Sequence, residues 1–264
     1  MGECFYKLAC LYGLSFVRAD IASILEPIQL ALSPGGSESV VHMLQAALDM
    51  HPDWIVISSD IRNAFNTRKR AHILSSLFQE AKLAPLWRLA SWSYGSSSPL
   101  LMMDHGKVIF ELLSSEGVKQ GDVLASLLFA LSMKDLYSDC IKNLDCHAAA
   151  VMDDFYLFGP AAPTFNAFDR FSSSLESRQT GLVLNLQKSV ALIPSGDRKI
   201  AELCKSRKLS YTSKLLPCLG AAISRSRKEL SKWLKQTCPK LHQSLFTLLL
   251  DPSLPSQYSY LIQG

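Results

Sequence analysis

The sequence has few charged residues and no long apolar run. Charged side chains make up 19% of the 264 residues and hydrophobic ones 48%, whereas globular proteins average roughly 25% charged residues. This composition argues against intrinsic disorder and supplies enough apolar side chains for a sizeable core. Because no apolar run approaches the roughly 20 residues needed to cross a bilayer, we expect no membrane-spanning segment and no membrane partner.

Cysteine is present, but not in the patterns that build disulfide frameworks or zinc sites. The seven cysteines form no C-x-x-C pair, and their odd number disfavours complete pairing. Cys140, Cys146 and His147 are close in sequence, yet they lack the usual zinc spacing, so we interpret both cysteines as buried core residues. The N-terminus also lacks a basic signal region, a cleavage site and a myristoylation pattern. We therefore expect an intracellular protein, in the cytoplasm or the nucleus and not secreted.

The positive charge is concentrated near the C-terminus. The whole chain carries +4, whereas residues 198–240 hold twelve Lys or Arg against Glu202 and Glu229, a local charge of +10 that leaves −6 for the rest. This asymmetry suggests a polyanion bound to the basic segment and a cation held by carboxylates elsewhere. A solvated helical face explains the basic segment equally well.

Hydrophobic periodicity predicts helices that alternate with short strands. Helices are expected over residues 5–32, 37–50 (with Ser37 as N-cap), 67–80, 85–94, a long segment capped by Asp122, 164–179 and a segment from about 225. Strands are expected over residues 54–57, 100–103, 107–113, 148–152, 155–158, 188–193 and 219–223. Because the strands come in hairpins with helices between them, we expect an α+β fold with an antiparallel sheet.

Acidic residues stand where two buried strands end. Asp60 follows an apolar strand, and Asp153 and Asp154 occupy the tip of an apolar hairpin. If these strands are neighbours, the three carboxylates converge and suit one or two divalent cations with oxygen ligands. Paired Mg²⁺ ions about 4 Å apart support in-line phosphoryl transfer. An Asp-Asp pair at a turn is also explained by the ordinary turn preference of Asp, so the pair alone does not decide.

Segments in consistent order resemble the motifs of reverse transcriptases, in the form found in non-LTR, LINE-like retrotransposons. They are SDIRNAFNTRKR at 59–70 (motif A), GVKQGDVL at 117–124 running on to Leu128-Phe129 (motif B), VMDD at 151–154 (motif C), GLVLN at 181–185 with Lys188 (motif D) and Leu219-Gly220 (the primer-grip turn of motif E). The resemblance covers about residues 6–223. It implies an RNA-directed DNA polymerase that adds dNTPs to a primer 3′-hydroxyl on an RNA template with a DNA primer; no protein partner is expected.

The resemblance also implies roles for single residues. Asp60, Asp153 and Asp154 become the catalytic ligands of two Mg²⁺ ions, for which Mn²⁺ substitutes, and the backbone carbonyl of Ile61 is a further ligand. Phe65 matches the aromatic gate that excludes a 2′-hydroxyl from the incoming nucleotide. This position argues against an RNA-dependent RNA polymerase, because a phenyl ring excludes the hydroxyl that such enzymes bind.

Other implied roles have plain structural alternatives. Gln120 and Gly121 precede a helix N-terminus, which suits a phosphate or template backbone, but a helix cap at Asp122 also explains this loop. Lys188 is expected near the leaving pyrophosphate, unless it is an ordinary surface lysine. Arg70 is expected either to tie the motif A helix to the acidic centre or to form a surface salt bridge.

The chain departs from the family pattern in three places. Val151 replaces the usual aromatic of motif C, and Ala125-Ser126 replace a common Ser-Pro. The third departure is an N-terminal truncation: the finger strands that supply triphosphate-binding Arg and Lys would lie before Met1, so we expect them to be absent. The resemblance thus predicts a right-hand polymerase palm with an antiparallel sheet packed by helices: partial fingers over 1–50, palm with motifs A to D over 51–215, and primer grip and the start of a short helical thumb over 216–264. The alternative is a truncated, non-catalytic relic that folds and binds nucleic acid weakly.

Overall fold

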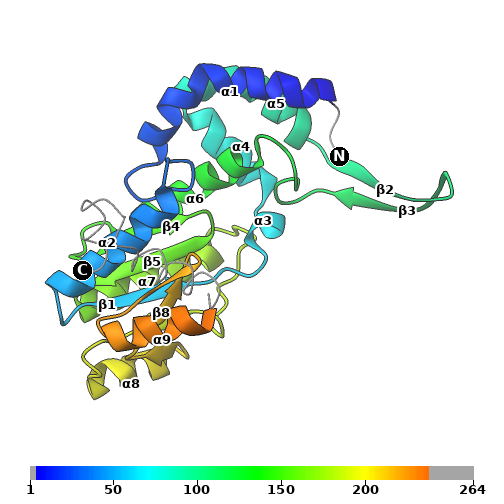
Figure 1. Ribbon diagram of the computed structural model, residues 1–264. Helices are drawn as coiled ribbons and strands as arrows, with labels where there is room; N and C mark the ends of the chain where they lie inside the picture. Colours follow the sequence, from blue (N-terminus) through cyan, green and yellow to red (C-terminus); the bar gives the residue numbers. More distant parts are fainter. Residues whose placement is uncertain (1–3, 238–264) are drawn as a thin grey trace, which may run out of the picture.

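The computed structural model of the protein describes residues 4–237, in which helices alternate with short strands (Figure 1). The helices are α1 (Cys4–Leu25), α2 (Gly36–Met50), α3 (Ala64–Thr67), α4 (Arg70–Gln79), the 3₁₀ helix η1 (Ala81–Leu83), α5 (Ala84–Tyr94), α6 (Ala125–Ile141), α7 (Ala161–Ser177), α8 (Arg198–Ser206) and α9 (Arg227–Thr237). The strands are β1 (Ile55–Ser59), β2 (Ser98–Asp104), β3 (Lys107–Ser114), β4 (His147–Val151), β5 (Asp154–Gly159), β6 (Val190–Leu192), β7 (Ser210–Thr212), β8 (Leu216–Cys218) and β9 (Ala221–Ile223).

A five-stranded sheet in the order β4-β5-β1-β6-β7 carries the motifs. Strand β1 lies in its middle and pairs antiparallel with β5 and with β6, while β4 and β5 form an antiparallel hairpin. The predicted α+β class is confirmed. Strand β7, which the sequence analysis did not include, adds a single parallel pair with β6.

The central strand is buried on both faces, as its uninterrupted apolar run predicts. Ile55 and Ile57 are fully buried in the larger core, to which α4, α5, α6 and α7 contribute. Val56 points to the opposite face and packs in a second core with Leu44 and Leu48 of α2. Apolar side chains therefore pack on both faces of the sheet.

Some expected helix boundaries are wrong, and each difference has a local cause. Helix α1 ends at Leu25, before Pro27, and the next residues join the sheet edge through a bridge between Gln29 and Ala150. Ser37 is not an N-cap: α2 begins at Gly36 because Gly35 adopts the left-handed conformation (φ 65°), and its N-terminus has no side-chain cap.

The helix expected over 67–80 begins only at Arg70, as α4, and the short helix α3, which ends at Thr67, precedes it. Between them the backbone bonds to other segments: the amide of Gly117 donates to the carbonyl of Arg68 (2.8 Å), and the amide of Lys69 donates to the carbonyl of Thr180 (3.2 Å). These tertiary hydrogen bonds replace helical ones, so the motif A segment turns at this point.

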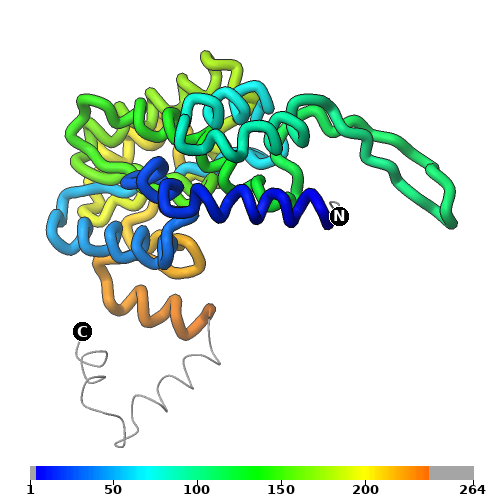
Figure 2. Tube along the Cα trace, turned by 90° about the horizontal axis from the view of Figure 1, so that it is seen from above, coloured from blue at the N-terminus to red at the C-terminus, as the bar shows by residue number. Residues whose placement is uncertain are grey.

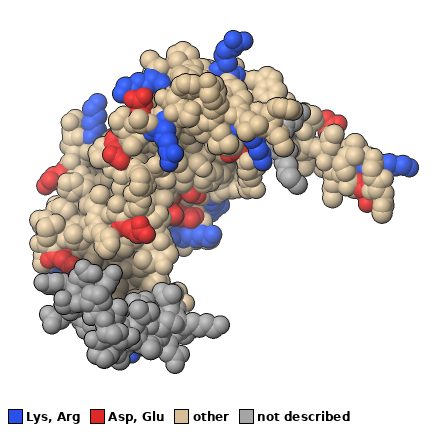
Figure 3. All heavy atoms as spheres, turned by 45° about the horizontal axis from the view of Figure 1, so that its top comes forward, with Lys and Arg blue, Asp and Glu red and all other residues tan. Residues whose placement is uncertain are grey.

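Strands β2 and β3 form a hairpin arm that projects away from the rest of the molecule (Figures 1 and 2). The predicted hairpin is confirmed, with His105 and Gly106 in its turn at positive φ. Its large apolar side chains are all more than half exposed: Leu100, Leu101, Met102, Met103, Val108, Ile109, Phe110, Leu112 and Leu113. On the face drawn in Figure 3, Lys and Arg are interspersed with Asp and Glu, and most of the arm is uncharged.

Helix α1 is long and apolar enough, by length and composition, to cross a membrane. The expectation that the sequence has no such segment is therefore wrong. The helix packs along α5 (Figure 1) and buries Cys10, Val17 and Ile21 in the larger core. A core helix passes the same test of length and composition, so this feature alone does not indicate a membrane.

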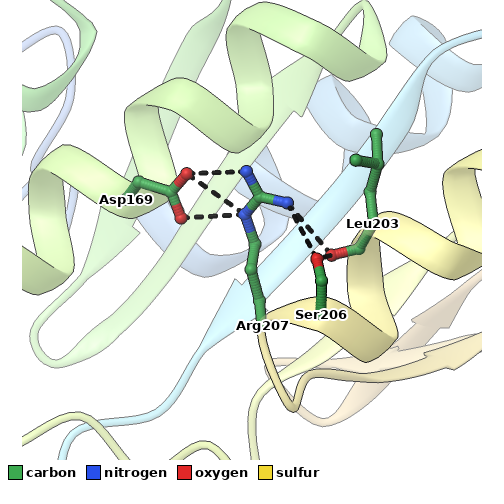
Figure 4. Close-up of polar contacts among 4 residues, drawn as sticks. All are labelled: Asp169, Leu203, Ser206 and Arg207. Carbon is green, nitrogen blue, oxygen red and sulfur yellow. Dashed lines mark hydrogen bonds and ion pairs between the residues drawn. The ribbon is translucent and has the colours of Figure 1, made fainter.

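Helix α8 is attached to α7 through one arginine (Figure 4). Arg207, just after α8, donates through Nη2 and Nε to the carboxylate of Asp169 at 2.7–3.1 Å, and its Nη1 donates to the carbonyl of Leu203. The guanidinium also lies over the ring of Phe165, 4.8 Å from its centroid. The carboxylate of Asp169 raises the pKa of Arg207, against the effect of burial. This contact secures the segment that leads to β7.

Candidate active site

The three acidic residues lie at one end of the sheet. In the β1–β5 pair Ser59 is aligned with Phe155, so Asp60 and Asp154 leave this pair at the same end. Asp153 lies beside Asp154, because Met152 and Asp153 are the two loop residues of the β4–β5 hairpin, in which Val151 pairs with Asp154. The sequence analysis expected the three carboxylates to converge if these strands are neighbours, and the strands are indeed neighbours in the sheet.

The carboxylates also interact electrostatically. Burial raises the pKa of Asp153, and the charge of Asp60 raises it further, while a backbone hydrogen bond acts in the opposite direction. For Asp154, which is more exposed, partial burial again comes first among the causes that raise the pKa, followed by the charges of Asp153 and Asp60. Asp153 and Asp154 are therefore harder to ionise, first because they are partly buried and then because neighbouring carboxylates are negative.

The backbone around Asp60 is held by the motif D segment. The Asp60 amide donates to Ser189 Oγ at 3.0 Å, and Asn185 donates its amide to the Asp60 carbonyl at 2.8 Å. Ile61 forms an antiparallel bridge with Leu184. The flanking hydrogen bonds of this bridge do not use the Ile61 carbonyl, which is the predicted metal ligand.

The acidic residues satisfy part of what a divalent cation requires. Carboxylate oxygens are suitable ligands, and a cation would neutralise the repulsion that raises the pKa values of Asp153 and Asp154. Within residues 4–237, however, no group of three or more His, Cys, Asp or Glu side chains is arranged as a ready metal site. Binding therefore requires the carboxylates to turn toward a common point.

Cys140 and Cys146 are buried, as expected, and burial raises the pKa of Cys146 to about 11.

Phe65 lies on α3 and contacts α6 through its ring. Its ring is half-buried and stacks on Phe129, with 4.1 Å between centroids and an interplanar angle of 15°. The carbonyl of Phe65 accepts a hydrogen bond from the amide of Val118 at 2.8 Å. Motif A and motif B are therefore joined at the residue expected to act as the sugar gate.

The motif B loop is held tightly at its start and is open at its end. Gly117 has φ 64°, and a Cβ there would lie 2.4 Å from the Phe65 carbonyl oxygen, so a glycine is required. Gln120 and Gly121 are exposed, and nothing lies within 4 Å of a Cβ built on Gly121. The loop therefore offers exposed residues beside a rigid attachment to motif A.

Asp122 does not cap the following helix as expected: α6 begins at Ala125, its N-cap position is Leu124, and no side chain caps it. Instead, the Asp122 carboxylate accepts hydrogen bonds from the amide of Leu124 (3.0 Å) and from the hydroxyls of Tyr94 (2.6 Å) and Tyr6 (3.1 Å). It thereby joins α1, α5 and the motif B loop. Burial raises the pKa of both tyrosines, and the negative charge of Asp122 raises it further.

Lys188 is an exposed residue, whereas Arg70 is buried and has neither of its expected contacts. Lys188 is exposed in the turn between motif D and β6, where its amide donates to the carbonyl of Asn185 at 3.1 Å. Arg70 neither reaches the acidic centre nor forms a surface salt bridge, so both predicted alternatives are wrong. It is buried and donates to the carbonyls of Gly117 (3.0 Å) and Ser114 (2.7 Å), which anchors the base of the β2–β3 arm.

Sequence reasoning missed three residues around the site: Gln29, Tyr137 and Ser189. Gln29 and Tyr137 both contact the backbone of Met152 in the acidic turn, and Ser189 contacts that of Asp60. A polar residue inside an otherwise apolar segment was the only available signal, and it did not show which backbone each residue contacts.

Comparison with known proteins identifies the family. The sequence matches the family described as reverse transcriptase (RNA-dependent DNA polymerase) over residues 17–236. The chain belongs to the reverse transcriptase family. It is a nucleotidyltransferase domain by family, and its resemblance to retrotransposon enzymes is supported by a second match. The chain is 27% identical over 196 residues to the retrotransposable element SLACS 132 kDa protein of Trypanosoma brucei gambiense. That match covers 72% of this chain and 16% of the relative, so this reverse transcriptase chain spans only a small part of its length.

Solved structures agree on the fold. A telomerase of Candida albicans in complex with the TWJ fragment of telomeric RNA matches with a TM-score of 0.56 and 13% identity, over 87% of this chain and 40% of that one. An apo telomerase of Candida tropicalis matches with a TM-score of 0.55 and 16% identity, over 85% and 44% of the two chains. The reverse transcriptase chain thus has the mixed helix and sheet fold of a polymerase palm.

Proposed function

We propose that this chain is the RNA-directed DNA polymerase domain of a non-LTR retrotransposon, which transfers dNTPs to a primer 3′-hydroxyl. The observation that carries the proposal is the position of Asp60 beside the Asp153-Asp154 turn, at one end of the sheet in a member of the reverse transcriptase family. Within that assignment, residues 1–50 correspond to partial fingers, 51–215 to the palm, and 216–264 to the primer grip and the start of a thumb. The part of that last segment beyond residue 237 lies outside the described residues.

The acidic end of the sheet is the proposed reaction centre. Asp60, Asp153, Asp154 and the carbonyl of Ile61 would hold two Mg²⁺ ions, or Mn²⁺ in their place, and such ions activate an attacking oxygen and stabilise a leaving one. The chain supplies the rigid support. Ser189 and Asn185 hold the Asp60 backbone, and the β4–β5 hairpin presents Asp153 and Asp154 beside it.

Nucleotide selection is assigned to Phe65 and the loops around it. The ring of Phe65 is kept in place by its stack on Phe129, so it would exclude a 2′-hydroxyl by volume. Gln120 and Gly121 are exposed beside this ring's segment and would contact the template or the incoming nucleotide. Lys188 is exposed and cationic, and would face the leaving pyrophosphate.

Nucleic acid is the proposed partner. Helix α9 buries none of its residues and carries Lys232 and Lys235 on its exposed surface, with Trp233 half-buried between them. Exposed lysines suit phosphate contacts, which require charge but no base recognition. The Candida albicans neighbour, a telomerase solved with telomeric RNA, is consistent with an RNA template.

Primer extension tests the proposal. The assay uses poly(rA)/oligo(dT) with Mg²⁺ or Mn²⁺ and compares the wild type with Asp153→Asn and Asp145→Asn. Asp145 is an exposed carboxylate just before β4, at the opposite end of that strand from the acidic turn, so it serves as a matched control. We expect extension by the wild type and by Asp145→Asn, and loss of at least 100-fold in Asp153→Asn.

Two results would contradict the proposal. Equal loss in both variants would mean that the acidic turn has no special role. A folded wild type that extends no primer but still retains RNA on a gel would instead support the alternative, a truncated chain that binds nucleic acid weakly without catalysis.

A further inference from the structure

Gln29 is a buried polar residue that belongs to none of the recognised motifs. Only 1% of it is exposed. Its side-chain Oε1 accepts hydrogen bonds from the amides of Met152 (2.9 Å) and Ala31 (3.1 Å), and its Nε2 donates to the carbonyl of Met152 at 3.0 Å. Three of the four hydrogen-bonding positions of this side-chain amide are therefore used, and two of the three bonds go to one residue of the acidic turn.

Met152 needs such support. It is the first of the two loop residues in the β4–β5 hairpin and has φ 57°, in the left-handed region that non-glycine residues adopt at a cost. Its carbonyl accepts a second hydrogen bond from the hydroxyl of Tyr137 at 2.9 Å, and Tyr137 is itself fully buried and stacked on Phe155. Both polar groups of the Met152 backbone are thus held from outside the hairpin.

The backbone of the Gln29 segment is attached independently of its side chain. The amide of Ala150 donates to the carbonyl of Ile28 (2.7 Å), and the amide of Leu30 donates to the carbonyl of Ala150 (2.8 Å), so the segment lies along β4. Removing the amide group of Gln29 would leave these bonds in place. The side chain therefore has a separate task, at the turn.

We propose that Gln29 is a positioning residue for Asp153, with Tyr137 as its partner. By holding the amide and carbonyl of Met152, the two side chains fix the peptide plane that precedes Asp153 and so fix the direction in which its carboxylate leaves the turn. This inference rests on the proposed metal-binding role of Asp153. A purely structural role would stabilise the hairpin without changing cation affinity.

The chain contains a matched control for this role. Gln45 on α2 makes the same pair of bonds to one backbone residue elsewhere: Nε2 donates to the carbonyl of Ser224 (3.1 Å) and Oε1 accepts from its amide (3.1 Å). Replacing either glutamine by methionine retains similar volume and removes three hydrogen bonds: the pair to one backbone residue and one local bond, from the Ala31 amide for Gln29 and to the Asp49 carboxylate for Gln45. Of the two glutamines, only Gln29 contacts the acidic turn.

The test is Mn²⁺ binding to the full chain, followed by the decrease in the free-ion electron paramagnetic resonance signal. Asp153→Asn, Gln29→Met, Tyr137→Phe and Gln45→Met are compared with the wild type, and melting temperatures are recorded in parallel. We expect Gln29→Met to weaken Mn²⁺ binding about 10-fold, as loss of a residue that orients a ligand does in known metal sites. Tyr137→Phe should weaken it less, because both Gln29 bonds remain, and Gln45→Met should lower only the melting temperature.

The outcomes separate this inference from the proposed function. If Asp153→Asn weakens Mn²⁺ binding but Gln29→Met binds as Gln45→Met does, the positioning role is overturned and the metal site stands. If Asp153→Asn binds Mn²⁺ like the wild type, the metal site itself is wrong. Should Gln29→Met fail to fold, Gln29→Glu keeps the shape and both accepted bonds while losing the donor to Met152, and it too should bind Mn²⁺ more weakly than the wild type.

Discussion

Asp60 and Asp154 leave the same end of the antiparallel β1–β5 pair, because Ser59 is aligned with Phe155. Burial raises the pKa of Asp154, and the negative charges of Asp153 and Asp60 raise it further. Ionised carboxylates that are held together in this way lower the free energy of unfolding of the chain.

Removal of one carboxylate should not destabilise the fold. Without divalent cations, we expect Asp153→Asn to melt between zero and about 3 °C above the wild type, where 1 kcal/mol corresponds to about 2–4 °C for a chain of this size. The reason is that the pKa of Asp153 is raised by burial and by Asp60, so its ionised form is disfavoured in the folded state. A clearly lower melting temperature would argue against a repulsive cluster.

The same difference should depend on pH. A carboxyl group whose folded pKa is raised binds its proton at a higher pH in the folded state than in the unfolded state. The cost of ionisation is therefore complete at neutral pH and is relieved as the pH falls through the raised pKa values of Asp153 and Asp154. Urea unfolding should show that the difference in free energy of unfolding between Asp153→Asn and the wild type decreases from neutral to mildly acidic pH. A difference that stays constant or increases would contradict the direction of the pKa shifts of Asp153 and Asp154.

Gly117 should tolerate no side chain, whereas Gly106 should. Both have positive φ, at 64° and 77°, but a Cβ at Gly117 would lie 2.4 Å from the Phe65 carbonyl oxygen, while nothing lies within 4 Å of one at Gly106. We expect Gly106→Ala to cost about 1 kcal/mol for its backbone conformation alone. Gly117→Ala should cost about 3 kcal/mol, since overpacking is added to that strain. Chemical denaturation of the two variants measures the difference. If both substitutions lower the free energy of unfolding equally, the backbone contact between motifs A and B can move to accommodate a Cβ.

The Arg207 contact should stabilise the chain by more than an ordinary surface ion pair. Arg207→Ala removes both the forked bond to Asp169 and the contact with the Phe165 ring. We expect a loss of about 1–2 kcal/mol, since exposed ion pairs and cation–π contacts each contribute up to about 1 kcal/mol. Asp169→Asn keeps the ring contact and should cost less than half as much. Thermal unfolding of both variants and of Arg198→Ala, an exposed control on α8, tests this order.

Replacing Phe65 should relax sugar selection. In Phe65→Val the volume that would exclude a 2′-hydroxyl is lost, so we expect the ratio of ribonucleotide to deoxynucleotide incorporation to rise about 10-fold or more, a change of about 1.4 kcal/mol in discrimination. Single-nucleotide extension with each substrate gives this ratio. Phe129→Leu removes only the stacking partner of Phe65 and should change this ratio less. An unchanged ratio in Phe65→Val would show that Phe65 does not select the sugar.

The positions of the acids were predictable because they stand just after apolar runs, in the order that the motif resemblance requires. Asp60 follows β1, and Asp153 and Asp154 lie at the turn of the β4–β5 hairpin, where the pattern indicated. The hydrogen-bond partners of the residues around the acids were not predictable in the same way. Gln29 lies 123 residues from Met152, and Arg70 donates hydrogen bonds to carbonyls at the base of an arm that only tertiary folding brings near. Periodicity describes a single segment, so it carries no information on which distant carbonyl a polar side chain will contact.

The strand order also has a consequence for the synthesis of the chain. Strand β1 lies between β5 and β6, and Ser189, just before β6, holds the backbone of Asp60. A nascent chain that has emerged from the ribosome only as far as Thr180 already contains all three carboxylates, yet one edge of β1 has no partner and Asp60 has no support. The arrangement proposed as the reaction centre can therefore form only after the residues up to about Leu192 have emerged. Until then, the unpaired edge of β1 is open to pairing with other strands.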